Sequence, residues 1–454
     1  MARSSSRRSR RDFLGTLGLG ALAAGATPSI LSADERRRAR PLQRTRRYSP
    51  NDQVQLAVIG AGGMGVADSR TALSVPGVTM VAACDLYDGR REAAREAWGD
   101  ISTTRDYREI LARDDVDAVI VGTPDHWHQR ISVDALRAGK AVYCEKPMVH
   151  SIGEGAELIR AQRESGKTFQ VGSQGMSSLG NEKARELLAE GAIGELNYAE
   201  GFWARNDPIG AWQYAIPDDA SPATVDWERY LEGITQRPFD ALRFFRWRNY
   251  RDYGTGVAGD LFVHLFSSLH FVTGAVGPRK VMAQGGLRYW EDGREVPDVL
   301  LGMFDYPETD AHPGFNLSLR VNFVDGTSGS TFLRLVGSEG AMDVTWTEVI
   351  LRKNKATPPD DVFAQMKAAE AGASVPPRKT MLPPAEVVYR AEDGYMGAHF
   401  DHFVNFFSGV RNGTPVTEDA VFGLRAAAPA LACNESYFSD RIVRWDPEAM
   451  EIES

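Results

Sequence analysis

Apolar and polar positions alternate in blocks along the first third of the chain, where four short apolar runs stand out. The runs are Val54–Ile59, Val78–Cys84, Asp117–Gly122 and Ala141–Cys144. Segments of helical character separate them, and glycine, aspartate or proline turns end them. Because strands that alternate with helices pair in parallel, we predict a doubly wound parallel sheet over residues 53–174.

The pattern changes from residue 175 onward, where strand-like and partly alternating runs follow one another without helices between them. They cover residues 279–290, 298–306, 315–324, 329–336 and 341–352. Consecutive strands of this kind predict a large, mainly antiparallel sheet. Tyr395–Gly409 and Thr417–Tyr437 have helical spacing. We therefore predict an α+β domain over residues 175–454, with its final helices near the domain junction.

The bulk composition agrees with two globular domains, since 454 residues are too many for one compact core. Residues 1–50 hold twelve arginines against three acids, so the remainder carries a formal charge of −18. Such an acidic body is unsuited to nucleic acid, whose binding relies on clustered Lys and Arg. Cys84, Cys144 and Cys433 are too widely spaced to indicate a disulfide framework or a zinc site.

The beginning of the chain resembles an export signal. Arg10-Arg11 precede an apolar run, diluted by Gly and Ala, that is too short to span a bilayer. Adjacent arginines before such a run are typical of a twin-arginine signal, which we assign to residues 1–33; a disordered basic tail is the alternative. Residues 34–52 are interpreted as a basic linker. We expect periplasmic export by the twin-arginine machinery and no stable membrane anchor. No cysteine precedes Cys84, which argues against a lipoprotein anchor.

A glycine-rich loop, Gly60-Ala61-Gly62-Gly63-Met64-Gly65, joins the first strand to a helical stretch. This G-x-G-x-x-G spacing is informative because a strand precedes it and a helix follows. Gly60 permits the tight turn, Gly62 lets the backbone approach a pyrophosphate, and Gly65 lets the helix pack on the strand. The helix start attracts phosphates. The sequence therefore predicts a dinucleotide site at this turn.

The second strand ends at Asp85, twenty residues after Gly65. A carboxylate there can accept hydrogen bonds from the adenosine ribose hydroxyls, and it repels a 2′-phosphate. NAD is thus favoured over NADP, although Arg90 and Arg91 lie close in sequence.

Glu145-Lys146-Pro147 follows the fourth strand directly. Proline stops regular pairing there, and ligands of open α/β sheets bind at the carboxyl ends of the strands. Lys146 is therefore a candidate catalytic ammonium, with a solvated turn lysine as the alternative.

The loop after the third strand carries Asp125-His126-Trp127-His128 near the expected cleft. The alternative is a helix start with aromatic packing. Histidines two positions apart do not share a helical face, so we expect no metal site.

Asp260 and His264 are four positions apart, a spacing that shares a face on a helix through 261–272. His264 alone also fits a buried core histidine. The segment Trp247–Gly259 before them, rich in aromatics and glycine, suits the wall of a sugar site or a brace for the helix. We expect Gln174, Trp247 and Tyr250 to contact substrate.

Three ordered motifs, spread over 54–174, resemble the family of glucose-fructose oxidoreductase, inositol dehydrogenase and rhizopine-catabolism proteins (Gfo/Idh/MocA). They are Gly60-x-Gly62-Gly63-Met64-Gly65, Thr123-Pro124-x-x-x-His128, and Ala138-Gly139-Lys140 leading to Glu145-Lys146-Pro147. The resemblance implies that NAD is bound by the glycine-rich loop, Asp85, Thr123, Pro124 and His128, with Glu145 and Lys146 at its reactive end. The loop residues are Gly60, Gly62, Gly63, Met64 and Gly65. It also implies that Asp260 and His264 form a catalytic pair, and that the second domain's open sheet makes homo-oligomer contacts.

The predicted chemistry is NAD-dependent oxidation of a secondary hydroxyl in a sugar or cyclitol. His264 would exchange the hydroxyl proton, Asp260 would orient it, and Lys146 would stabilise the developing alkoxide. The alternative is that Lys146 and His264 exchange these roles. Export favours NAD that stays bound and is recycled within the site. One alternative is glycoside cleavage through transient oxidation and elimination, and another is sugar or nucleotide binding without turnover.

Overall fold

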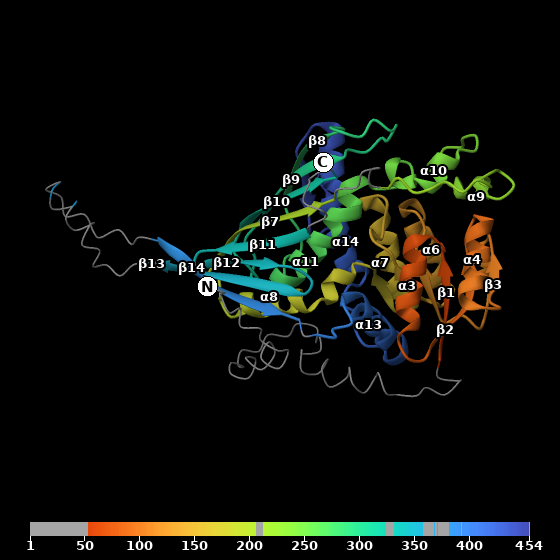
Figure 1. Ribbon diagram of the computed structural model, residues 1–454, viewed down its shortest axis with the longest axis horizontal. Helices are drawn as coiled ribbons and strands as arrows, with labels where there is room; N and C mark the ends of the chain where they lie inside the picture. The colour runs from red at the N-terminus through yellow and green to blue at the C-terminus, as the bar shows by residue number, and fades with distance from the viewer. Residues whose placement is uncertain are drawn as a thin grey trace, which may run out of the picture.

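The computed structural model describes residues 53–205, 212–323, 331–356, 381–391 and 393–453, together with residues 367 and 370. The predicted signal and linker, residues 1–52, lie outside the described residues. Two sheets organise the described chain, and each forms the centre of one domain (Figure 1).

The first sheet has six strands in the order β3-β2-β1-β4-β5-β6, and all its pairs are parallel. Its strands are β1 (Val54–Ile59), β2 (Val78–Cys84), β3 (Ser102–Thr104), β4 (Ala118–Val121), β5 (Ala141–Cys144) and β6 (Phe169–Val171). The helices between them are α3 (Gly63–Leu73), α4 (Asp88–Trp98), α5 (Tyr107–Leu111), α6 (His128–Arg137) and α7 (Gly155–Ser165). The predicted doubly wound parallel sheet is confirmed, with β1 at its centre.

The second sheet has ten strands in the order β14-β13-β12-β11-β7-β10-β9-β8-β15-β16. Its strands are β7 (Leu196–Ala204), β8 (Lys280–Gly286), β9 (Val299–Tyr306), β10 (Phe315–Asn322), β11 (Thr331–Gly337), β12 (Gly340–Val344), β13 (Glu348–Ala356), β14 (Met381–Arg390), β15 (Val443–Asp446) and β16 (Glu451–Ile452). The prediction of a large, mainly antiparallel sheet is confirmed, with one exception: β7 pairs with β10 in parallel.

The apolar run at residues 341–352 is two strands rather than one. β12 and β13 pair as an antiparallel hairpin, because Thr345 accepts and donates hydrogen bonds with Glu348 and closes a tight turn between them. Apolar alternation continues through this turn, so the hydrophobic pattern alone could not locate it.

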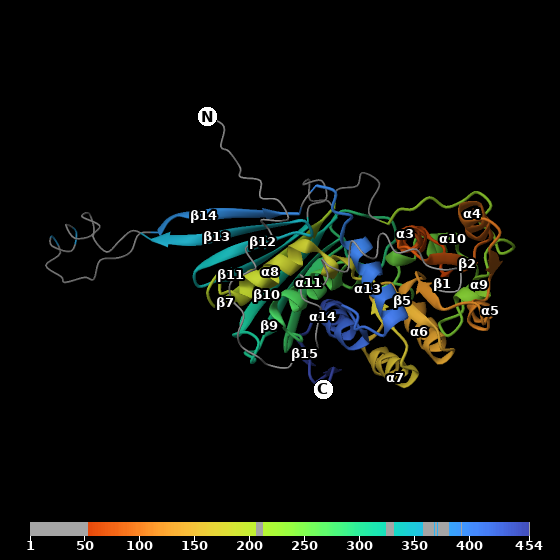
Figure 2. The same ribbon diagram turned by 90° about the horizontal axis from the view of Figure 1, so that it is seen from below.

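Helices cover one face of the second sheet. They are α8 (Leu179–Ala189), α11 (Val263–Thr273) and α14 (Ala420–Ser439), and they lie side by side in Figure 2. Along β8 and β9 the buried residues alternate with exposed ones, so the other face of these strands is open to solvent.

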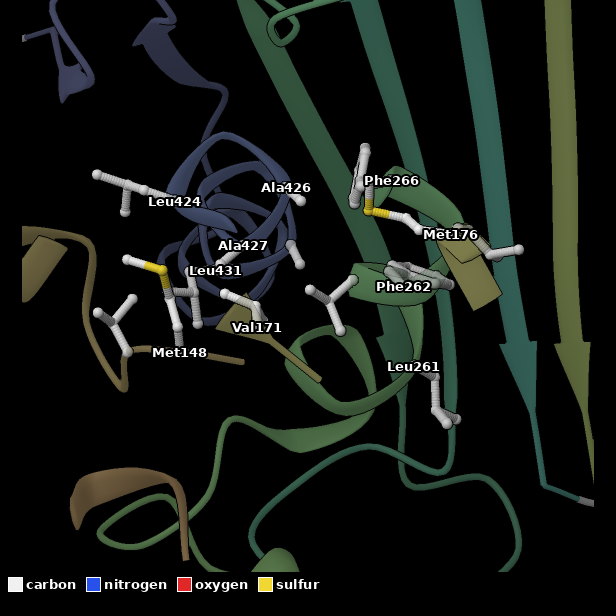
Figure 3. Close-up of a cluster of buried hydrophobic side chains, with 14 of the residues drawn as sticks. Met148, Val171, Met176, Leu261, Phe262, Phe266, Leu424, Ala426, Ala427 and Leu431 are labelled. Atoms are coloured by element: carbon white, nitrogen blue, oxygen red, sulfur yellow. The ribbon is translucent and has the colours of Figure 1, made fainter. Parts of the chain in front are cut away.

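The core at the junction of the two domains is built around α14 (Figure 3). Met148 and Val171 approach this helix from the first domain, and Phe262 and Phe266 approach it from the second. Gly423 lets the domains approach closely, because a Cβ there would lie 2.5 Å from Val171 and 2.8 Å from Met148. Burial of such side chains supplies most of the favourable free energy of packing.

α13 (Ala398–Asn412) belongs to the core of the first domain although it comes late in the chain. Phe403 stacks on Tyr143 of β5 with ring centroids 4.2 Å apart, and Phe406 meets the same ring edge-on. The helix also contacts α3. The last two helices therefore lie against the first domain and at its junction with the second.

Between β7 and α11 the chain returns to the first domain. Residues 212–250 carry α9 (Trp227–Tyr230), α10 (Ala241–Phe245) and the short helix η5 (Trp247–Asn249), which lie beside α4 and β3 in Figure 1. A π-helical turn, η6 (Ala258–Phe262), then leads into α11.

Candidate active site

A cavity of about 390 Å³ lies at the carboxyl ends of β1, β2 and β4. One wall comes from the glycine-rich loop through Gly60, Gly62, Gly63 and Met64. The opposite wall comes from the second domain and includes Trp247 and Arg248. This is the edge of the sheet where open α/β folds bind their ligands.

The loop after β1 has the geometry of a dinucleotide-binding turn. Gly60 adopts a φ of +91°, and a Cβ there would lie 2.6 Å from the backbone of Gly122. A Cβ on Gly65 would lie 1.9 Å from the carbonyl oxygen of Gly60, so only glycine allows α3 to pack this closely. α3 begins at Gly63 without a side-chain cap, which leaves its first amide groups available to an anion. These features fit a pyrophosphate.

Asp85 lies at the end of β2, buried at 5% exposure and lining the same cavity. The amide of Tyr87 donates to its carboxylate at 2.9 Å, and the Arg90 guanidinium lies 3.7 Å away. A carboxylate in this place fits the adenosine ribose hydroxyls of NAD.

The loop after β4 places Thr123 and Pro124 on the cavity wall. The hydroxyl of Thr123 is buried without a partner among the described residues. His128, in contrast, lies behind the wall: its two ring nitrogens bond the carbonyl oxygens of Pro147 at 2.7 Å and Thr123 at 2.8 Å. His128 therefore ties the loop after β4 to the loop after β5 and positions the cofactor wall from behind.

Asp125 and His126 connect the same loop to the second domain. Asp125 accepts hydrogen bonds from the amide and hydroxyl of Thr255 at 2.9 and 2.7 Å. His126 lies between the carbonyl oxygens of Tyr253 and Tyr230. Within the described residues no group of three His, Cys, Asp or Glu side chains could hold a metal ion. The three cysteines are buried and unpaired.

Lys146 lies at the end of β5, and its ammonium reaches across to the π-helical turn. It donates to the carboxylate of Asp260 at 2.8 Å and to the backbone carbonyl of the same residue at 2.7 Å. Arg248 donates to the same carboxylate oxygen at 3.2 Å. Burial alone would raise the pKa of Asp260, but the charges of Lys146 and Arg248 outweigh it and hold the pKa below its ordinary value. Because Arg248 also lines the cavity, the Lys146–Asp260 pair lies at that end of it.

His264 does not bond Asp260, contrary to the prediction that Asp260 orients this ring. The expected α-helical face is interrupted by the π-helical turn, where bonds span five residues, so positions 260 and 264 no longer overlie each other. The His264 ring instead lies against Trp203, with centroids 5.1 Å apart. Burial and the charge of Lys146 hold the pKa of His264 well below its ordinary value, so the ring is neutral near pH 7. Its Nδ1 has no partner among the described residues.

Glu145 is buried, does not line the cavity, and belongs to a buried cluster near Lys146. The amide of Gln174 donates to Glu145 at 2.7 Å and to Asp68 of α3 at 3.4 Å. Burial, and then repulsion from Glu145, holds the pKa of Asp68 well above its ordinary value. Burial also raises the pKa of Glu145, but the nearby charge of Lys146 opposes this. Asp68 therefore holds the proton of the pair, and Glu145 presents the negative charge to Lys146.

Two of the three predicted substrate contacts are corrected. Gln174 uses its amide for Glu145 and Asp68, and it is 2% exposed. Tyr250 is buried beneath the guanidinium of Arg243, which lies 4.2 Å from its ring centroid. Tyr250 and Tyr253 pack in a buried aromatic cluster with Tyr230 and Phe244. This packing explains why the composition of 247–259 fitted a structural support for the helix as well as the wall of a sugar site. Trp247 does line the cavity.

The site also contains Asp68 and Trp203, which sequence reasoning did not single out. They and Arg248 reach the site from three separate elements, and only folding brings them together. Arg248 lies in the predicted aromatic segment, but nothing in that pattern pointed to its bond with Asp260.

Residues 54–173 match the profile of an oxidoreductase family described as having an NAD-binding Rossmann fold, Gfo/Idh/MocA. Over these residues the first domain is similar to the Gfo/Idh/MocA family. The cofactor of this domain is NAD, in agreement with the uncapped helix start and with Asp85. Within the described residues, no helix combines the length and the apolar character needed to cross a membrane.

The curated relatives that match over about a third of the chain include a hydratase and a dehydrogenase. The chain is 31% identical over 163 residues to 2,7-anhydro-N-acetylneuraminate hydratase of Mediterraneibacter gnavus, covering 35% of the chain and 43% of that protein. It is 30% identical over 145 residues to inositol 2-dehydrogenase of Salmonella typhimurium, covering 31% of the chain and 43% of that protein. The chain thus spans less than half the length of these relatives.

Among solved structures, levoglucosan dehydrogenase in complex with NADH resembles this chain in fold over both domains. The TM-score is 0.62 at 18% sequence identity, and the match covers 86% of this chain and 99% of that one. This likeness shows that the second domain shares its fold with that protein.

Proposed function

We propose that the protein is an NAD-dependent oxidoreductase that acts on a secondary hydroxyl of a sugar, a cyclitol or a sugar derivative. One observation carries the proposal: a buried ammonium, Lys146, is held by Asp260 at the end of the NAD cavity, near a neutral histidine. The names of the relatives, which include an inositol dehydrogenase and a levoglucosan dehydrogenase, support a polyhydroxylated substrate.

NAD, when bound, accepts a hydride from the substrate carbon and can return it. The chain's own residues handle the proton and the charge. His264 is neutral with a free Nδ1, so it can accept the hydroxyl proton as a general base. Lys146 is a fixed donor that can stabilise the oxygen as it gains negative charge. Asp260 acts on Lys146 rather than on His264, because its carboxylate binds the ammonium.

The reverse assignment gives Lys146 the proton and leaves His264 to position the substrate hydroxyl. The ammonium of Lys146 is fixed by two bonds to Asp260, and the charge of Glu145 lies nearby, which suits Lys146 to the role of an electrostatic donor. We adopt His264 as the base for this reason.

We further propose that residues 1–33 direct export by the twin-arginine pathway and that NAD leaves the cytoplasm bound to the folded protein. A periplasm with little free NAD would require the cofactor to be returned to its starting state within the site. The second candidate function, glycoside cleavage by transient oxidation and elimination, meets this requirement without net redox change. It is supported by the names of relatives that act on anhydrosugars.

A homo-oligomer is proposed from the open face of the second sheet. Met282, Leu301 and Met303 are 40%, 49% and 53% exposed on this face, and they line one hollow together with Phe202 and Phe332. Exposed apolar patches of this kind mark protein interfaces.

The first test identifies the nucleotide released from denatured protein by absorbance and mass, and then screens free sugars, cyclitols and aryl glycosides without added NAD. Paired ketone and alcohol products are expected from internal recycling. Product from glycosides with no net redox change would instead favour cleavage by elimination, and turnover only with added NAD would leave an ordinary dehydrogenase. Absence of any nucleotide would contradict the proposed function.

The second test measures how much Lys146 and His264 each contribute to catalysis. Lys146→Ala and His264→Ala are each expected to lower kcat about 10²-fold, the scale of a lost acid/base or electrostatic group. Both variants should still bind NAD. Activity within a few-fold of the wild type would remove that residue from the chemistry.

A further inference from the structure

The second domain supplies about a third of the residues that line the NAD cavity. Residues 212–250, here called the roof segment, leave that domain and lie across the carboxyl ends of β1 to β3 (Figure 1). Tyr214, Tyr230, Phe244, Phe245 and Trp247 of the roof segment line the cavity opposite the glycine-rich loop. The adenosine end of the site is therefore enclosed between two domains.

The roof segment is attached to the first domain by backbone pairing. Tyr87 and Val225 form an antiparallel β-bridge at the end of β2. On either side of it, the amide of Asp226 donates to Leu86 and the amide of Asp88 donates to Thr224, each at 3.0 Å. The roof thus pairs with the segment that follows β2, two residues beyond Asp85.

Side chains outside the cavity hold the roof at two further points. The hydroxyl of Tyr87 donates to Asp219 at 2.5 Å. Glu232 forms ion pairs with Arg108 of α5 and Arg130 of α6. This hydrogen bond and these two ion pairs use no residue that lines the cavity, so they attach the roof segment without contacting the space for the ligand.

Arg90 connects the floor of the cavity to its roof. Its guanidinium lies 3.7 Å from the carboxylate of Asp85 and 5.7 and 5.4 Å from the ring centroids of Phe244 and Phe245. A cation over aromatic faces is attractive, and the same flat apolar surfaces suit a purine ring. Arg90, Phe244 and Phe245 lie next to Asp85, the carboxylate that fits the adenosine ribose, so they lie where adenosine would bind.

We propose that the roof segment is the second half of the NAD site: its aromatic wall receives the adenosine, and its attachments retain NAD from one turnover to the next. The proposal rests on the proposed function, because only an NAD-binding enzyme needs such a wall. A nucleotide enclosed on both sides dissociates only when Tyr87–Val225 pairing and the outer attachments open. Slow release is the property that an enzyme recycling its cofactor requires.

The test measures NAD release from the full chain after loading with labelled NAD and adding excess unlabelled NAD. The attachment variant is Asp219→Asn with Glu232→Gln, which alters neither a cavity residue nor a catalytic one. The wall variant is Phe244→Ala with Phe245→Ala. Each is expected to accelerate release about tenfold or more, the scale of a lost base–aromatic contact or its positioning. The matched control, Glu157→Gln with Asp305→Asn, removes two exposed ion pairs elsewhere and should release NAD at the wild-type rate.

Release from both variants at the control rate would overturn the proposal. Exchange of wild-type NAD within seconds would also overturn it while leaving the NAD-dependent activity intact, whereas failure to bind NAD at all would refute the proposed function itself. Should a variant not fold, hydrogen exchange of the wild type decides. Added NAD is expected to slow exchange at the amides of 224–226 and 241–249, and unchanged exchange there would refute the roof's role.

Discussion

The ammonium of Lys146 donates to both the carboxylate and the backbone carbonyl of Asp260, so one residue of the second domain fixes the lysine of the first. The π-helical turn that carries Asp260 makes these two hydrogen bonds possible, because it removes the backbone carbonyl of Asp260 from the regular α-helical hydrogen-bond pattern. Docking of the two domains and assembly of the site are therefore the same event.

Asp260→Asn is expected to destabilise the protein strongly. The change leaves the charges of Lys146 and Arg248 without their buried counter-ion, and loss of one partner of a buried pair costs about 3–5 kcal/mol. Denaturant unfolding measures this difference. Asp305→Asn, which breaks an exposed ion pair with Lys280, is the control and should cost less than about 1 kcal/mol. Equal costs for the two variants would show that Asp260 is not the counter-ion.

The protonation of His264 is expected to respond to Lys146. Burial and then the lysine charge hold the pKa of His264 below its ordinary value, so the neutral base is present above that lowered pKa and is lost as pH falls through it. Lys146→Met removes the like charge and should shift the His264 titration to higher pH, as followed by NMR of the labelled ring. Lys280→Met, far from the site, should not move it. An unchanged titration in Lys146→Met would show that the charge of Lys146 does not affect the pKa of His264.

The first domain was predictable from sequence because its signals are local. β1, β2 and β5 begin and end at the predicted residues, since each apolar run meets a glycine, an aspartate or the Glu145-Lys146-Pro147 turn. The glycine pattern also predicted the cavity, because the steric demands of Gly60 and Gly65 are set by the turn itself. Lys146 could be placed at the strand end for the same reason.

The contacts that complete the site were not predictable, because they join distant positions. The pairing of Asp68 with Glu145 through Gln174 leaves no periodic signal. The π-helical turn at Asp260 follows from tertiary contacts, and the local sequence reads as an ordinary helix. α13 and the roof segment pack on the first domain from late in the chain, so domain assignment by sequence order could not include them.

Asp85→Ser is expected to weaken the preference for NAD over NADP. The carboxylate repels a 2′-phosphate, and its removal leaves Arg90 free to attract one. The ratio of NADP to NAD released from protein made in the same cells should rise about tenfold or more, which corresponds to about 1.4 kcal/mol of changed relative affinity. Mass spectrometry of the released nucleotide measures it, with the exposed Asp100→Ser as the control. An unchanged ratio would remove Asp85 from cofactor selection.

Glu418→Gln is expected to stabilise the protein above neutral pH and to have little effect in mild acid. Glu418 is fully buried, accepts a hydrogen bond from Ser267 at 3.0 Å, and has its pKa raised by burial to about 8. Between its ordinary value of 4.5 and about 8 the folded state keeps the proton and the unfolded state loses it, so stability falls as pH rises. The slope is about 1.4 kcal/mol per pH unit, or about 3 kcal/mol by pH 7.

Glutamine keeps the shape of the protonated acid and does not titrate, so Glu418→Gln should remove this slope. Thermal unfolding at pH 5 and pH 7.5 measures the gap in Tm between variant and wild type, which should be small at the lower pH and wide at the higher. Glu448→Gln changes an exposed glutamate paired with Arg425 and should show the same Tm as the wild type at both pH values. A gap that does not change with pH would mean that Glu418 is ionised in the folded protein, with its charge balanced by groups other than Ser267.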